Sequence, residues 1–261
     1  KMAKVKHISI DTPDKEALRI RGVRREVIFT NREKTKLKDH VEWDISNSDQ
    51  YTHVTLNETV DGIEIFDLPD GVNFVADASS TLLSRPLDCS KFSIIYACAQ
   101  KNLGIAGLTV VVLNKKKVKL RGTNLPQMLN YSTHIQSDSL YNTSPTFAIY
   151  ITYLMTSWIR KSGGLDFFEQ LNIKKSRALY DYIDSSEIFY NDIAEDNRSR
   201  MNIVFSMKDK SREQEFIDKC TEEGVYNIRG HRVRGGMRAS LYNAMPQQGV
   251  DQLIQVMSEF C

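Results

Sequence analysis

A single lysine interrupts an otherwise apolar stretch of the chain, FSIIYACAQKNLGIAGLTVVVL at residues 92–113. Lys101 follows Gln100 and precedes a turn that contains Gly104 and Gly107. A lysine at the end of a buried strand is partly removed from water, which lowers its pKa and makes the neutral amine available as a nucleophile. Such an amine can form a Schiff base with a carbonyl compound. Considered alone, a lysine that extends from a strand end into solvent is the simpler interpretation.

A carboxylate ends another apolar strand upstream of this lysine. Asp77 lies in NFVADASS, residues 73–80, where a helix N-cap is the simpler interpretation and a metal ligand is another. In an enzyme that uses pyridoxal phosphate (PLP), a carboxylate pairs with the protonated pyridine nitrogen and keeps the ring an electron sink. Ligands of α/β sheets lie beyond the carboxyl ends of the strands. An aspartate and a lysine that both end buried strands therefore favour PLP chemistry.

Two polar residues precede a predicted helix start. Asn142 and Thr143 lie in YNTSPTF, residues 141–147. Backbone amides and hydroxyls at the amino end of a helix favour phosphate, so this pair is a candidate phosphate contact. Ordinary helix capping explains the same residues.

A cationic cluster lies in RGHRVRGGMRAS, residues 229–240, and comprises His231, Arg232, Arg234 and Arg238. Guanidinium groups bind carboxylate and phosphate through two parallel hydrogen bonds. A solvated hairpin and an RNA-contacting loop are the alternatives. The formal net charge of only +2 and the lack of an aromatic stacking platform nearby argue against RNA and favour a small anionic ligand.

The composition is that of a soluble globular protein. Hydrophobic residues make up 41% of the 261 residues and charged residues 26%, which does not suggest a dedicated binder of nucleic acid or membranes. Four cysteines without C-x-x-C spacing predict reduced thiols in a cytoplasmic protein, with neither a zinc site nor disulfides. The most apolar segment, residues 145–159, is interrupted by threonines and tyrosines and is too short for a bilayer, which predicts a buried helix.

The elements that must position these groups differ between the two halves of the chain. Apolar β-rich runs in the first half predict strands buried on both faces of a parallel or mixed sheet, at residues 25–29, 51–56, 72–77, 92–97 and 107–113. Ser144 as a cap and Pro145 at the first helical position predict a helix that ends before Gly163. The second half then predicts helices at 165–184, 212–224 and 249–260 and strands at 201–207, 225–230 and 237–244.

This pattern predicts an α/β fold in two domains. A large, mixed but mostly parallel sheet occupies residues 1–160, and a small α+β domain with helices on one face of a short sheet occupies residues 161–261.

Several segments closely resemble the phosphoserine aminotransferases, a family of fold-type I PLP enzymes. They are NETVDG (57–62), ADASSTLLSRPLD (76–88), IYACAQKNLGIAGLTVVV (95–112), DSLYNTSPTFAIY (138–150), NRSRMNIVF (197–205) and GHRVRGGMRASLYNAMPQQGV (230–250). The resemblance extends from about Trp43 to the carboxyl terminus. The last two segments are specific to this family among PLP enzymes.

The resemblance implies a cofactor role for four residues. Lys101 forms the covalent link to PLP and later moves the proton between substrate and cofactor. Asp77 holds the pyridinium nitrogen, Thr59 bonds the ring hydroxyl, and Gln100 contacts the cofactor phosphate.

The resemblance also implies a homodimer. Asn142 and Thr143 reach the phosphate of the cofactor bound by the neighbouring subunit. His231, Arg232 and Arg238 bind the anionic groups of the substrate. The implied reaction is amino transfer between glutamate and 3-phosphohydroxypyruvate in serine biosynthesis, and in some bacteria also the phosphohydroxythreonine step of PLP synthesis.

The amino-terminal segment departs from the family pattern. A glycine-rich stretch with a phosphate-binding arginine, an aromatic residue that stacks on the pyridine ring and a His-Arg pair are absent from residues 1–42, and residues 11–36 have no counterpart. Residues 1–10 resemble the strand that follows the stacking helix. We therefore expect an amino-terminally truncated chain that is weakly active or inactive alone. The alternative is a non-catalytic, dimer-forming remnant of the fold.

Overall fold

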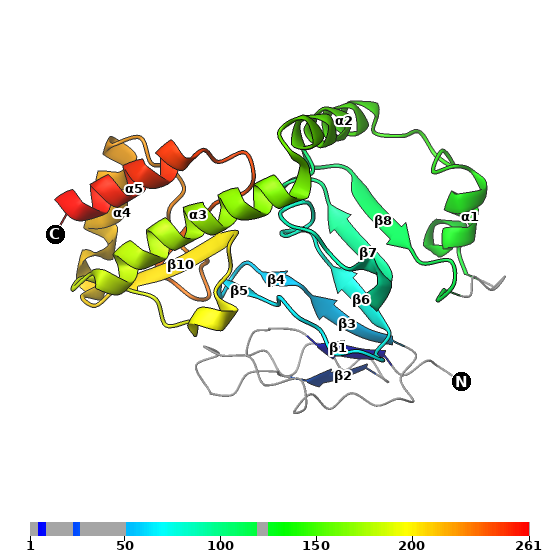
Figure 1. The fold of residues 1–261 in the computed structure, drawn as a ribbon, viewed down its shortest axis with the longest axis horizontal. Helices are drawn as coiled ribbons and strands as arrows, with labels where there is room; N and C mark the ends of the chain where they lie inside the picture. The colour runs from blue at the N-terminus through cyan, green and yellow to red at the C-terminus, as the bar shows by residue number, and fades with distance from the viewer. Residues whose placement is uncertain (1–4, 9–22, 27–50, 119–124, 261) are drawn as a thin grey trace.

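One sheet organises the first half of the chain. The structure is a computed structural model that describes residues 5–8, 23–26, 51–118 and 125–260 (Figure 1). Six strands lie in the order β2-β1-β3-β6-β7-β8. Their bounds are β1 Val5–Ile8, β2 Val23–Glu26, β3 Tyr51–Thr55, β6 Phe74–Asp77, β7 Phe92–Cys98 and β8 Thr109–Leu113. All neighbours pair in parallel except β7 and β8, which are antiparallel, so the predicted mixed and mostly parallel sheet is confirmed.

The two faces of this sheet differ in burial, so the prediction of strands buried on both faces is wrong. Val54, Phe74, Ala76 and Ile95 are at most 2% exposed and pack on one face. The side chains that alternate with them along β3, β6 and β7 are half-buried. Because successive side chains point to opposite faces, the polar end residues of these strands share the less buried face.

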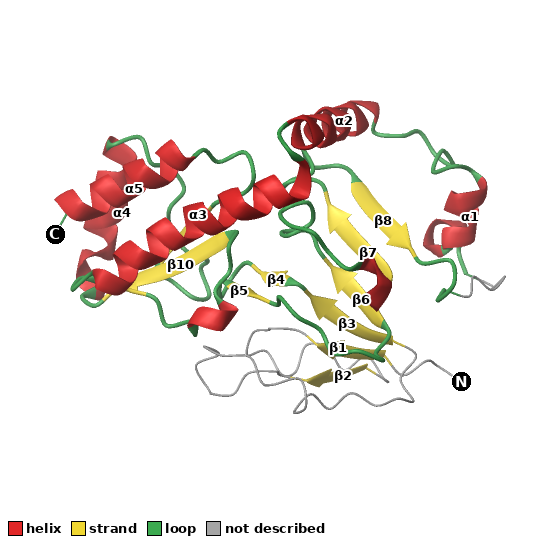
Figure 2. Ribbon diagram, in the orientation of Figure 1, coloured by secondary structure: helices red, strands yellow, loops and turns green. Residues whose placement is uncertain are grey.

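A second, smaller sheet forms the C-terminal layer, which we define as residues 164–260. Its antiparallel strands lie in the order β11-β10-β9, with β9 at Phe189–Tyr190, β10 at Asn202–Met207 and β11 at Met237–Ser240. Three helices, α3 (Gly164–Ser185), α4 (Glu213–Glu222) and α5 (Gln247–Glu259), contribute to one core with these strands (Figures 1 and 2). The α+β layer predicted for this half is therefore present.

Shorter elements connect the two sheets. Strands β4 (Asn57–Glu58) and β5 (Ile63–Glu64) form a hairpin, and helices α1 (Tyr131–Gln136) and α2 (Thr146–Lys161) precede α3. Single 3₁₀ turns occupy Cys89–Lys91, Gln127–Leu129, Glu195–Asn197 and Lys210–Arg212. Helix α3 runs from the end of α2 beside the large sheet into the C-terminal layer (Figure 1). The domain boundary after residue 160 stays a prediction.

Two predicted elements are wrong in detail. Residues 225–230 form no strand and keep a single bridge from Arg229 to Met237, because Asn227 adopts a left-handed backbone conformation (φ +60°) that interrupts an extended chain. The strand predicted over 237–244 ends at Ser240. Beyond it the carbonyls of the following turn accept hydrogen bonds from Lys175 instead of a neighbouring strand.

The start of α2 also differs by one residue from the prediction. Pro145 is the N-cap and no side chain caps the helix, so Ser144 does not have the predicted capping role. Of the strand predicted at 25–29, residues 27–29 lie outside the described residues. Among the helices of the described ranges, none has the length and apolar character that a bilayer crossing requires.

Candidate active site

Lys101 lies in a turn that follows β7. The backbone N–H of Ala99 donates to the Leu108 carbonyl at 2.9 Å and closes this turn. The lysine is half-buried. Burial lowers its pKa, the Arg238 guanidinium lowers it further, and the Asp77 and Glu58 carboxylates oppose both. These charges lie near enough to act on one amine, so Lys101, Asp77, Glu58 and Arg238 form a candidate site.

Asp77 is the last residue of β6 and is in register with Tyr96 of β7. Its Oδ1 accepts a hydrogen bond from the backbone N–H of Ser79 at 2.9 Å, and Ser79 Oγ in turn accepts one from the Cys98 N–H at 3.0 Å. The carboxylate is therefore oriented by its own turn. β6, which ends at Asp77, and β7, which precedes the turn with Lys101, are neighbours in the sheet, whereas the sequence predicted only that the two strands share one sheet.

A tyrosine and a histidine accompany this aspartate on the same face. Tyr96 Oη lies 2.9 Å from His53 Nε2, and Tyr96 is in register with Asp77 of the neighbouring strand. Burial raises the pKa of Tyr96, and the Asp77 charge raises it further. Sequence reasoning missed both residues, although the period-2 pattern of β7 places Tyr96 on the Asp77 face.

Thr59 and Arg238 meet although they are far apart in the chain. Arg238 of β11 extends its Nη1 to the Thr59 carbonyl at 3.0 Å. Thr59 lies in the turn between β4 and β5, and Glu58 Oε2 accepts the backbone N–H of Asp61 at 2.6 Å within that turn. The C-terminal layer thus contributes a guanidinium to the site formed by the large sheet.

Gly62 allows the β4–β5 turn to approach β10 of the second sheet. Its φ is +75°, and a Cβ built there would lie 2.9 Å from both the Asn202 carbonyl oxygen and Val204 Cγ2 of β10. The Ser199 N–H also donates to the Gly62 carbonyl at 2.9 Å. The β4–β5 turn therefore packs directly on the second sheet, and only glycine fits without displacement.

The remaining predicted site residues lie at the surface. Gln100 is exposed beside Lys101, and Asn142 and Thr143 are exposed ahead of α2, where Asn142 Nδ2 donates to the Thr143 carbonyl at 3.3 Å. His231 is half-buried and Arg232 exposed in the turn that precedes β11. The structure brings Lys101, Asp77, Thr59 and Arg238 together. It leaves this second group open to an incoming molecule.

Arg234 does not belong with the anion-binding residues, contrary to its grouping in the sequence. Its Nη1 donates to Asp61 at 3.0 Å and its Nη2 to Asp192. The two carboxylates, Asp61 and Asp192, lie far from Arg234 in the sequence. The residues around Arg234 therefore give no sign of these ion pairs. Arg234 ties the turn before β11 to the β4–β5 turn and has its donors committed there.

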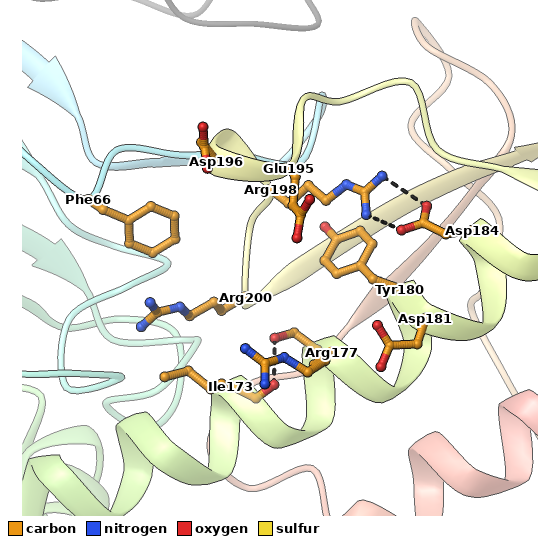
Figure 3. Close-up of a pocket in the computed structure, with 11 residues that line it drawn as sticks. Phe66, Ile173, Arg177, Tyr180, Asp181, Asp184, Glu195, Asp196, Arg198 and Arg200 are labelled. Carbon is orange, nitrogen blue, oxygen red and sulfur yellow. Dashed lines mark hydrogen bonds and ion pairs between the residues drawn. The ribbon is translucent and has the colours of Figure 1, made fainter.

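A separate cavity of about 400 Å³ lies along α3 (Figure 3). None of the predicted site residues lines it. Two of its three arginines are paired, since Arg198 bonds Asp184 and stacks on Tyr180, while Arg200 bonds Glu169 and stacks on Phe66. This cavity is a junction of structural ion pairs. Within the described residues, no group of three or more histidine, cysteine or acidic side chains is arranged to hold a metal.

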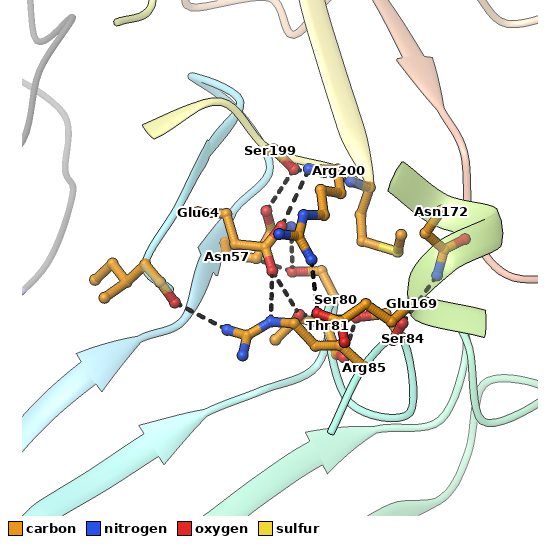
Figure 4. A network of polar contacts seen from close by, with 12 residues as sticks. Asn57, Glu64, Ser80, Thr81, Ser84, Arg85, Glu169, Asn172, Ser199 and Arg200 are labelled. Carbon is orange, nitrogen blue, oxygen red and sulfur yellow. Dashed lines mark hydrogen bonds and ion pairs between the residues drawn. The ribbon is translucent and has the colours of Figure 1, made fainter. Parts of the chain in front are cut away.

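A buried carboxylate links the two sheets next to the site. Glu64 is 1% exposed and accepts hydrogen bonds from Arg85 Nε at 3.1 Å, Thr81 Oγ1 at 3.2 Å and the Arg200 N–H at 3.1 Å (Figure 4). A buried charge is tolerated only when it is paired and hydrogen-bonded in this way. Glu64 thus holds the turn after Asp77 against the start of β10.

Comparison with known families assigns the fold. The family model described as aminotransferase class-V matches residues 2–253, so the chain belongs to that family. The match begins well before Trp43, where recognisable motifs start in the sequence.

Within that family, the chain is similar to proteins named phosphoserine aminotransferase. The chain is 46% identical over 221 residues to the phosphoserine aminotransferase of Hahella chejuensis, covering 84% of this chain and 61% of that protein. It is 43% identical over 228 residues to the phosphoserine aminotransferase of Acinetobacter baylyi, covering 87% and 64%. The chain therefore spans less than two thirds of the length of these relatives.

Solved structures agree. The PLP-bound phosphoserine aminotransferase of Trichomonas vaginalis superimposes with a TM-score of 0.88 at 33% identity, over 98% of this chain and 76% of that one. The phosphoserine aminotransferase of Bacillus circulans gives 0.84 at 40% identity, over 87% and 64%. The fold predicted from the sequence, that of the PLP-dependent aminotransferases, is confirmed.

Proposed function

We propose that this chain acts as a phosphoserine aminotransferase, which transfers an amino group between glutamate and 3-phosphohydroxypyruvate. The observation that carries the proposal is the convergence of Lys101, Asp77 and Arg238, in which burial lowers the pKa of the lysine amine. An amine, a carboxylate and a guanidinium are the groups required to attach an aldehyde, hold a ring nitrogen and bind an acid.

These residues fit PLP. Lys101 offers a half-buried amine of lowered pKa, which adds to an aldehyde carbon with loss of water. Asp77, fixed by the Ser79 N–H, presents a carboxylate that can hold a protonated pyridine nitrogen. The cofactor, when bound, supplies an electron sink for the substrate carbanion.

The other predicted cofactor residues have proposed roles of their own. We propose that Thr59 bonds the ring hydroxyl and that Gln100 contacts the cofactor phosphate. We further propose that Asn142 and Thr143, exposed ahead of α2, reach the phosphate held by a second subunit, so that the active species is a homodimer.

The substrate residues account for the anionic class of the substrate. Arg238 enters the site from β11, while His231 and Arg232 lie on the turn before it. A phosphorylated oxo acid bears two anionic groups, and hydrogen bonds to charged groups are each worth about 1.5–3 kcal/mol. We assign Arg238 to one group and His231 with Arg232 to the other, without a preference between phosphoserine and phosphohydroxythreonine.

The activity of the 261-residue polypeptide by itself is a further part of the proposal. Since it spans 61% of the length of the Hahella relative, we expect weak turnover unless an intact partner completes the site. We place the enzyme in the cytoplasm because its thiols are free: Cys89, Cys98 and Cys220 form no disulfide among the described residues.

The test is to incubate the purified protein with PLP and reduce the mixture with borohydride. Peptide mass mapping then identifies the modified lysine, and formation of 2-oxoglutarate from glutamate measures turnover. We expect the adduct on Lys101. An adduct distributed over surface lysines alone would contradict the proposal and favour a non-catalytic, dimer-forming protein. Robust turnover would contradict only the expectation of weak activity.

A further inference from the structure

Three buried asparagines from distant segments meet behind the turn that bears Lys101. None is more than 2% exposed. Their side-chain amides donate to three consecutive carbonyl oxygens, at 3.2, 2.8 and 3.0 Å. The pairs are Asn102 with Leu82, Asn243 with Leu83, and Asn172 with Ser84. We call Asn102, Asn172 and Asn243 the asparagine junction.

The three asparagines also bond one another. The backbone N–H of Asn243 donates to Asn102 Oδ1 at 3.0 Å, and Asn172 Nδ2 donates to Asn243 Oδ1 at 2.9 Å. Figure 4 shows Asn172 of α3 reaching Ser84 at the edge of the Glu64 network. Because a displacement of one amide breaks the bonds of the next, the junction is a connected unit.

Three of the four segments tied at the junction bear or adjoin a residue of the proposed active site, and the fourth is α3, which supplies Asn172. Asn102 directly follows Lys101, and the carbonyls of residues 82–84 belong to the turn that follows Asp77. Asn243 follows β11, which bears Arg238. Leu83 adopts φ +66°, a conformation that side-chain-bearing residues rarely take, and its carbonyl is the one held by Asn243.

Lys175 of α3 holds the segment that contains Asn243, residues 241–245. It is 0% exposed, and its Nζ donates to the carbonyls of Leu241, Tyr242 and Met245 at 3.3, 2.9 and 3.0 Å. An ammonium has three N–H donors, and all are used. Burial lowers the pKa of Lys175 to about 8. No carboxylate pairs with it among the described residues. Its contacts hold the 241–245 turn that presents Asn243.

We propose that the asparagine junction and Lys175 are positioning residues that set the location of the Lys101 amine relative to Asp77 and Arg238. Buried amides are costly unless each is satisfied, and apolar side chains would have filled the same space. These amides instead bond the three segments that bear the site. The inference deepens the proposed function and rests on it for the importance of Lys101.

The test measures Lys101 without the cofactor. Competitive labelling with acetic anhydride over a pH series, read by mass spectrometry, gives the pH midpoint at which the Lys101 amine becomes reactive. We compare the wild type with Asn102→Ala and Asn243→Ala. Loosening the turn admits water, so we expect the midpoint to rise by ~0.5, a threefold change in neutral amine at fixed pH.

Asn191→Ala is the matched control. Asn191 Nδ2 also donates to a backbone carbonyl, that of Val204, and among the described residues Asn191 has no hydrogen bond to the asparagine junction. We expect this variant to lower the melting temperature without moving the midpoint. If an alanine variant does not fold, Asn102→Ser, which retains a hydroxyl, replaces it in the comparison.

The outcomes separate the two proposals. An unchanged midpoint in the Asn102 and Asn243 variants, with melting temperatures lowered as in Asn191→Ala, overturns the positioning role. The borohydride adduct of the wild-type protein tests the function independently. A raised midpoint without any adduct on Lys101 supports the junction and contradicts the proposed function.

Discussion

The C-terminal layer and helix α2, which lies beside the six-stranded sheet, bury their apolar side chains to different extents. In the C-terminal layer, Phe189, Phe205 and Phe216 pack with ring centroids 4.9–6.4 Å apart and are at most 1% exposed. Beside the sheet, α2 leaves Phe147 68% and Tyr153 63% exposed, so the prediction of a buried helix at 145–159 is wrong. The candidate chemistry lies on the sheet, while the layer encloses a complete core. A site must admit a ligand, so its surroundings bury less than a core does.

This difference in burial suggests a division of roles, in which the C-terminal layer stabilises the chain and the sheet bears the reactive groups. Arg238 connects the two regions, because it belongs to β11 of the C-terminal layer and its guanidinium bonds the Thr59 carbonyl at the candidate site. Substitutions in the layer are therefore expected to reduce stability, and substitutions on the sheet to reduce chemistry. Four measurements test this division.

Loss of the reactive amine is the largest expected effect. Lys101→Arg keeps the charge but removes the amine that adds to an aldehyde, so we expect the borohydride-reducible adduct and any turnover to fall by at least ~10³-fold. Lys115→Arg, in an exposed turn, is the control and keeps both. A reducible adduct of normal yield in Lys101→Arg would contradict the assignment of Lys101 as the reactive amine.

Truncation of an aromatic residue in the layer is the next largest effect. Phe216 is 0% exposed, so Phe216→Ala is expected to lower the free energy of unfolding by about 3–5 kcal/mol. Phe147→Ala on the exposed face of α2 is expected to change it by about 0.5 kcal/mol or less. Urea denaturation followed by circular dichroism measures both. Equal losses would show that the two regions do not differ in packing.

Comparing Gly62 with Gly71 tests the contact between the β4–β5 turn and β10 of the C-terminal layer. Gly62 and Gly71 have φ of +75° and +76°, but a Cβ meets β10 only at Gly62 and nothing within 4 Å at Gly71. We expect Gly71→Ala to cost about 1 kcal/mol of unfolding free energy and Gly62→Ala about 1–2 kcal/mol more. Thermal melts of the two variants give the comparison, and identical losses would mean that β10 moves aside.

The pH dependence of Lys101 is the smallest and most specific effect. Burial lowers the pKa of its amine in the folded state, so the neutral form persists to lower pH than in a model peptide. The unfolded chain binds more protons between the two pKa values, so this group makes stability rise with pH across that interval. Titration of adduct formation measures the first effect. A midpoint at or above the ordinary lysine value would contradict it.

Strand-end chemistry could be anticipated from the sequence because it follows from local patterns. Apolar runs that end at Asp77 and Lys101 place both residues at the carboxyl edge of a mostly parallel sheet, where their proximity is a topological consequence. The elements of the C-terminal half were likewise predicted from periodicity and glycine punctuation. The failures, at residues 225–230 and at the start of α2, occur where a single backbone conformation or cap decides the outcome.

The pairing of charges could not be anticipated. Arg234 looked equivalent to Arg232 in the sequence, yet its partners Asp61 and Asp192 lie 173 and 42 residues away. The asparagine junction joins residues separated by up to 160 positions. Such contacts depend on how the two sheets meet, for which one segment of sequence has no local signal.

By itself the sequence determined which groups could react and which fold presents them, because side-chain type and hydrophobic period act over a few residues. Only the tertiary structure decided that Arg234 is bound to Asp61 and Asp192 while Arg238 reaches Thr59, and how the asparagines and Lys175 hold the three segments together. The physical reason is that desolvation and hydrogen-bond partnership are set by neighbours in space, and those neighbours come from distant parts of the chain.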